Sequence, residues 1–80
     1  MAVEFDFSRL KGRITEKFGS SKALAEYLQM TPTALSRRLN NITPFQPEDI
    51  HAMCAQDCLD IDSRDIGVYF FTPKVLFLEP

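Results

Sequence analysis

The 80-residue sequence has one histidine, two cysteines, three glycines and no tryptophan. His51, Cys54 and Cys58 fall on one predicted helix, whereas a structural zinc site normally takes four ligands from two separate segments. No serine or cysteine has a base and an orienting group that the sequence can place beside it. Three glycines provide no phosphate-binding loop. We therefore expect no metal, no cofactor, no small-molecule substrate and no catalytic residue, and hence no enzyme.

Long apolar runs are also missing. None approaches the roughly 20 residues that a membrane span needs. The start of the chain, Met1-Ala2-Val3-Glu4, is too short and too acidic for a secretory leader. We expect one domain over residues 1–80, in the cytoplasm and with no membrane partner.

The small net charge of −2 hides a strong asymmetry. Residues 1–42 contain seven Lys or Arg and four Asp or Glu, a net charge of +3, whereas residues 43–80 contain two and seven, a net charge of −5. A basic half is expected where one face of a small protein meets phosphate groups. An uneven division of charge by chance is the alternative.

Residues 20–40 have the pattern of two short helices joined by a tight turn. Ser20 can cap the first helix, and Thr31 followed by Pro32 can start the second. Such a pair is a helix-turn-helix, whose second helix can enter a DNA major groove. Apolar residues recur at helical spacing along one side of each helix: Leu24, Ala25, Leu28, Leu35 and Leu39.

The outward side of the second helix carries short hydroxyls and an arginine, which suit contacts to base edges and phosphates. Arg37 is the best candidate for a guanine or a phosphate, while the more lateral Arg38 could instead meet an acidic side chain. Ser21 and Lys22 begin the first helix and can face the DNA backbone. The candidate DNA-binding residues of the two helices are Ser21, Lys22, Thr31, Pro32, Thr33, Ser36, Arg37 and Arg38.

This stretch resembles the helix-turn-helix of phage Cro and repressor proteins. The resemblance is carried by Leu24-Ala25, Leu28, Met30-Thr31, Leu35-Ser36 and Leu39. The whole chain resembles small Cro-like proteins of temperate phages through Phe5-Asp6-Phe7-Ser8, Leu10-Lys11-Gly12-Arg13-Ile14 and Tyr69-Phe70-Phe71-Thr72-Pro73-Lys74-Val75.

The resemblance implies a mainly α, five-helix, Cro/repressor-like domain in a bacterial host cell. In Cro-like proteins the loop after the recognition helix lies close to the DNA backbone. This adds Asn40, Asn41 and Thr43 as candidate phosphate contacts, with ordinary turn residues as the alternative. Gln29 stands where such proteins usually have glycine, so a left-handed backbone there is less favourable.

The remaining helices are expected over residues 7–18, 47–57 and 63–69, and a short strand over about 74–79. Asp6 is expected to cap the first of these helices. The strand would contain the apolar run Val75, Leu76, Phe77 and Leu78. Pairing of two such strands about a twofold axis would give a homodimer. A tail that folds back onto its own helices is the alternative.

Two functions follow as hypotheses. The first is a sequence-specific DNA-binding transcriptional regulator, a Cro-like repressor that binds a pseudo-palindromic operator in double-stranded DNA as a homodimer. The second is a protein-interaction module, such as an antirepressor that binds another regulator. Three features favour this alternative: the negative net charge, the apolar C-terminal tail, and Pro32, which cannot donate a hydrogen bond.

Overall fold

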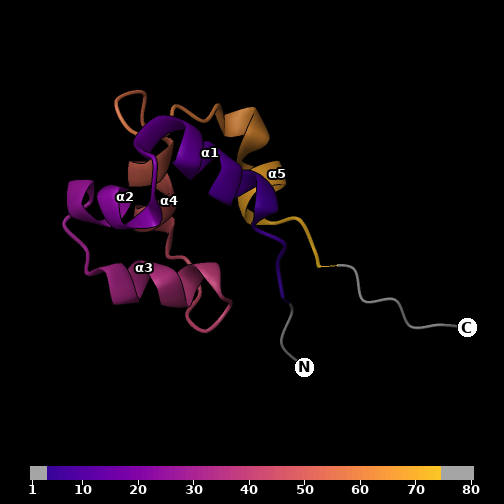
Figure 1. Ribbon diagram of the computed structural model, residues 1–80. Helices are drawn as coiled ribbons and strands as arrows, with labels where there is room; N and C mark the ends of the chain where they lie inside the picture. The colour runs from indigo at the N-terminus through magenta and orange to yellow at the C-terminus, as the bar shows by residue number, and fades with distance from the viewer. Residues whose placement is uncertain (1–3, 75–80) are drawn as a thin grey trace, which may run out of the picture.

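The structure is a computed structural model that describes residues 4–74 of the chain. These residues form five α-helices and one 3-10 turn, with a single β-bridge in place of any strand (Figure 1). The prediction of a small, mainly helical domain with five helices is thus confirmed for this part of the chain. The elements are α1 (Ser8–Phe18), α2 (Ser21–Tyr27), α3 (Pro32–Leu39), α4 (Pro47–Cys54), η1 (Ser63–Asp65) and α5 (Ile66–Phe70).

The predicted C-terminal strand, about 74–79, lies almost wholly outside the described residues. So do all four of the predicted dimerisation residues: Val75, Leu76, Phe77 and Leu78. Lys74 is the last residue that the structure describes. The strand and the dimer therefore stay predictions.

The two central helices begin where their caps predict. The Ser20 hydroxyl accepts a hydrogen bond from the Ala23 N–H at 3.2 Å, and the Thr31 hydroxyl accepts one from the Ala34 N–H at 3.1 Å. Each bond satisfies one of the N–H groups that the first turn of a helix leaves free. The short connection between α2 and α3 then brings their apolar sides together.

The first helix starts one residue later than expected. Its cap position is Phe7, so Asp6 lies just outside the helix and does not cap it as predicted. The Asp6 carboxylate instead accepts hydrogen bonds from the backbone N–H and the hydroxyl of Ser8. These bonds favour the charged form and hold the pKa of Asp6 below its usual value.

The core lies where α1 meets α2 and α5, with α3 packed on the far side of α2 (Figure 1). Two aromatic contacts connect the start of α1 to α5 through the loop before α4: the Phe7 and Phe45 rings lie 5.3 Å apart, as do the Phe45 and Phe70 rings. Both pairs are edge-to-face, the arrangement that the ring quadrupoles favour. The fully buried side chains are Leu10, Ile14, Leu24, Leu35, Met53, Leu59 and Phe70.

The fourth helix is shorter than predicted, and the loop that follows it is attached to α1. It stops at Cys54, and Ala55 has extended dihedral angles. Arg13 of α1 donates from Nε to the Leu59 carbonyl and from Nη2 to the Asp60 carbonyl, both at 2.9 Å. The Met53 and Cys54 carbonyls accept from the Leu59 N–H at 3.0 Å and the Ile61 N–H at 3.2 Å, whereas a continued helix would bond them to Asp57 and Cys58. Cys58 therefore lies beyond the helix that also holds His51.

α3 is attached to α4 by an ion pair. Arg38 Nε lies 3.2 Å from Asp49 Oδ2, and the two side chains are 18% and 22% exposed. Arg38 Nη1 also donates to the Ala34 carbonyl at 3.1 Å, while Asp49 accepts from the backbone N–H of Gln46. The sequence left open whether Arg38 contacts DNA or an acidic side chain, and the structure pairs it with the acidic Asp49.

The two ends of the described chain lie side by side. Phe5 and Pro73 form an antiparallel bridge, flanked by bonds from Asp6 N to Thr72 O (2.7 Å) and from Lys74 N to Glu4 O (2.9 Å). The backbone groups of Phe5 itself bond to the side chain of Asn41. The Phe5 N–H donates to Asn41 Oδ1 at 2.9 Å, and Asn41 Nδ2 donates to the Phe5 carbonyl at 3.0 Å.

Gln29 adopts the left-handed backbone that is unfavourable for it, with φ of 61°. Gln29→Gly should remove a steric cost of about 1–2 kcal/mol. Glycine adds back about 0.5–1 kcal/mol of unfolded-state entropy. We therefore expect the free energy of unfolding, measured by urea denaturation, to stay level or rise by up to about 1.5 kcal/mol.

Gln56→Gly is the matched control, because Gln56 is an exposed turn residue without positive φ. There glycine relieves no strain and should lower the free energy of unfolding by about 0.5–1 kcal/mol. Equal losses in the two variants would show that the backbone at Gln29 is not strained.

Arg37 and Arg38 offer a second matched pair. Arg38→Ala leaves the partly buried Asp49 carboxylate without its ion-pair partner and should lower the free energy of unfolding by about 1–2 kcal/mol. Arg37 is exposed and forms no ion pair among residues 4–74, so Arg37→Ala should change the free energy of unfolding by less than about 0.5 kcal/mol. Thermal unfolding of both variants measures the difference, and equal effects would exclude a stabilising role for the ion pair.

Candidate functional site

The outward face of α3 is uncovered by any of residues 4–74. Pro32, Thr33, Ser36 and Arg37 are exposed, while the opposite side of the helix is buried in the core. Ser21 and Lys22, at the start of α2, are exposed as well. The structure therefore brings a part of the predicted site together on one surface formed by α2 and α3.

Other predicted site residues already have partners inside the molecule. The Thr31 hydroxyl caps α3, and Arg38 is paired with Asp49. The Asn40 amide donates to the Ser36 carbonyl at 2.9 Å, and Asn41 bonds to the backbone of Phe5. The Asn41 and Arg38 side chains are thereby committed to the fold, whereas the exposed Thr31 hydroxyl can still donate and the exposed Asn40 amide oxygen can still accept.

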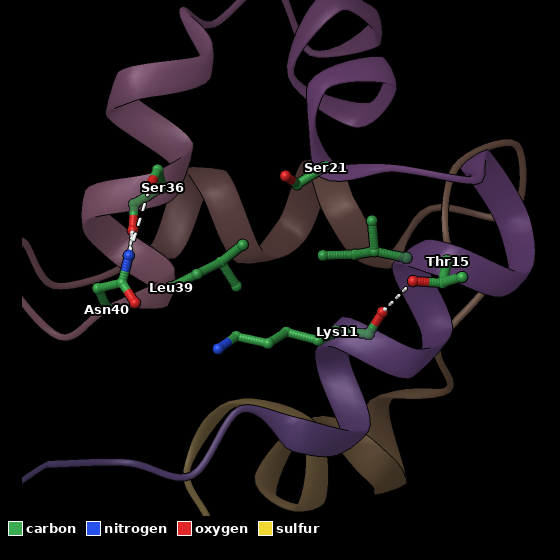
Figure 2. Close-up of a pocket in the computed structure, with 7 residues that line it drawn as sticks. Lys11, Thr15, Ser21, Ser36, Leu39 and Asn40 are labelled. Carbon is green, nitrogen blue, oxygen red and sulfur yellow. Dashed lines mark hydrogen bonds between the residues drawn. The ribbon is translucent and has the colours of Figure 1, made fainter.

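A polar hollow of about 300 Å³ lies between α1, the start of α2 and the end of α3 (Figure 2). The Lys11 side chain extends across its opening and the Ser21 hydroxyl faces into it (Figure 2). Thr15 donates to the Lys11 carbonyl at 3.1 Å, so its hydroxyl is engaged. Lys11 is a residue that the sequence did not single out, because only the fold places it opposite α3. This hollow can take a polar group of a partner.

A second, more apolar hollow of about 330 Å³ lies beside the loop after α3; we call it the aromatic hollow. Ile42 and Phe71, both on its wall, are 68% and 48% exposed. The one sequence signal for it is Ile42, an isoleucine within a turn-rich segment. Its lining residues are Phe5, Phe7, Arg38, Asn41, Ile42, Thr43, Pro44, Phe45, Phe70 and Phe71.

The titratable groups elsewhere do not form a reactive set in the described part of the chain. Burial raises the pKa of the Cys54 and Cys58 thiols, which favours the neutral form. The Tyr27 hydroxyl donates to Asp57 at 2.7 Å, and this bond raises the pKa of Tyr27. Within residues 4–74 no three potential metal ligands cluster.

Comparisons with known proteins point to a phage regulator of another type than Cro. A family model described as "Protein of unknown function (DUF739)" matches residues 2–73. The chain is similar to the solution structure of the modulator of repression (MOR) of the temperate bacteriophage TP901-1 from Lactococcus lactis, with 30% identity and a TM-score of 0.74. That match covers 84% of this chain and 88% of the other. No curated protein matches the sequence.

None of the helices formed by residues 4–74 has the length and apolar character that crossing a membrane requires.

These findings correct the prediction made from the helix-turn-helix pattern. Membership of the Cro and repressor family is wrong, because a different family model covers almost the whole chain. The DNA-binding, Cro-like repressor is also wrong as the main function, because the similar solved structure is a modulator of repression. The helix caps and apolar stripes determine how the two helices pack together, but they do not determine what the outer face of the helices contacts. The chain belongs to the family described as protein of unknown function DUF739.

Proposed function

We propose that this chain is a modulator of repression that acts by binding a repressor protein. The observation that carries the proposal is the similarity to the phage modulator of repression, at 30% identity and a TM-score of 0.74 over 84% of the chain. An identity of this size over most of both chains supports a related role as well as a related fold. The name of that protein refers to modulation of repression and not to a Cro-type repressor.

The surface around α3 is better suited to a protein than to DNA. Pro32 has no N–H to donate, and Arg38 is neutralised by Asp49. Ile42 exposes 68% of its surface in the loop where a phosphate contact would require a polar group. Protein interfaces, by contrast, have an apolar centre with a polar rim.

Finer features belong to the same proposal. We propose that α2 and α3 form a helix-turn-helix unit that contacts protein, with Ser21, Lys22, Thr33 and Arg37 on the contact surface. The chain would act as one domain, by binding without catalysis, in the cytoplasm of a bacterial host where repressors work. Homodimerisation through residues 75–78 stays a prediction.

The proposal predicts direct binding to the repressor encoded by the same genome. In isothermal titration calorimetry the full chain should bind the full-length repressor with a dissociation constant of about 1 μM or tighter. In fluorescence anisotropy with labelled operator DNA, addition of the chain should change the affinity of the repressor for the operator. The chain alone should show no saturable binding to the same DNA.

The opposite pattern would overturn the proposal. Saturable binding of the chain alone to operator DNA, weakened by orders of magnitude as salt rises, together with no repressor binding, would indicate a DNA-binding protein.

A further inference from the structure

The aromatic hollow adjoins a third hollow, with which it shares lining residues. This polar neighbour has a volume of about 310 Å³ and shares Arg38 and Thr43 with the aromatic hollow. Thr33 and Arg37 lie on its wall, on the outward face of α3. The two hollows therefore form one surface, apolar at the Ile42 end and polar at the Arg37 end.

The apolar end is held open by fixed backbone. The Ile42 N–H donates to the Arg37 carbonyl at 2.9 Å, and the Thr43 N–H donates to the same oxygen at 3.3 Å. Asn41, just before, bonds to both backbone groups of Phe5. The loop therefore cannot easily fold Ile42 inward, and its side chain stays exposed beside Phe71. A large apolar side chain fixed in water is a ready contact for a partner.

The polar end is positively charged. Arg37 is exposed, and among residues 4–74 its guanidinium takes part in no ion pair. The neighbouring Arg38 is paired with Asp49, so it contributes little net charge. Arg37 can accept a carboxylate in a two-point hydrogen bond.

We propose that the joined hollows bind a segment of the repressor in which an apolar side chain lies close to a carboxylate. The apolar side chain packs against Ile42 and the rings of Phe45 and Phe71, and the carboxylate pairs with Arg37. Charge complementarity at the Arg37 end favours this occupant over a purely apolar one. The inference rests on the proposed function and specifies its partner surface.

Two substitutions and two matched controls test this surface by calorimetry with the full chain and the full-length repressor of the same genome. Ile42→Asp and Arg37→Glu should each weaken binding at least tenfold, because one removes the apolar contact and the other repels the carboxylate. Val68→Asp and Arg9→Glu alter an exposed apolar residue and an exposed cation that line neither hollow, and should change binding less than twofold. Circular dichroism establishes that all four variants fold.

Salt separates the two ends of the surface. Raising the salt concentration should shrink the effect of Arg37→Glu and leave the effect of the uncharged substitution Ile42→Asn, since salt screens only the charged contact. Equal salt dependence for the two variants would overturn the division into an apolar and a charged end.

The possible failures are distinguishable. No binding by the wild-type chain would overturn the proposed function and this inference together. If Ile42→Asp and Arg37→Glu both bind the repressor as tightly as the wild-type chain does, the inference alone is overturned.

Two other occupants of the surface give their own results. If the chain self-associates in sedimentation velocity and Ile42→Asp abolishes this self-association, the surface binds a second copy. Movement of the Ile42 amide resonance in the variant Phe77→Asp would assign it to the C-terminal residues of the chain itself. Either of these last two results overturns the proposal.

Discussion

The paired hydrogen bonds between the Asn41 amide and the backbone of Phe5 hold the loop after α3 against the N-terminal segment. This segment in turn pairs with residues 72–74, so one side chain connects the middle of the chain to both of its described ends. Asn41 can do this because it accepts a left-handed backbone, with φ of 63°, at little cost. The aromatic hollow and its exposed isoleucine exist because this loop is fixed.

The adjacent arginines show why a helix-turn-helix pattern does not by itself identify a DNA reader. Arg37 and Arg38 are neighbours in the sequence, yet one is exposed and the other is held between the Ala34 carbonyl and Asp49. The difference follows from the 100° turn between successive helical residues and from the position of α4. The net charge counted over residues 1–42 is therefore larger than the positive charge that the surface presents to a partner.

Local signals predicted most of the helices, and tertiary contacts decided where the predictions failed. Ser20 and Thr31 cap α2 and α3 as expected, because capping involves only residues three apart. The loop that replaces the end of the predicted fourth helix is bound by Arg13, which is more than forty residues away from the carbonyls it contacts. The predicted site residues Asn41 and Arg38 likewise have distant partners that no local pattern reveals.

The sequence by itself determined five helices, the caps of α2 and α3, and the apolar stripes that bury the helices, since these depend on neighbours within one or two turns. It also placed the basic residues in the first half of the chain. Only the tertiary structure decided which of those residues remain exposed, and that Ile42, Phe45 and Phe71 converge beside α3. The physical reason is that exposure depends on which distant segments pack together, and the same two-helix pattern is compatible with an outer face that contacts DNA or protein.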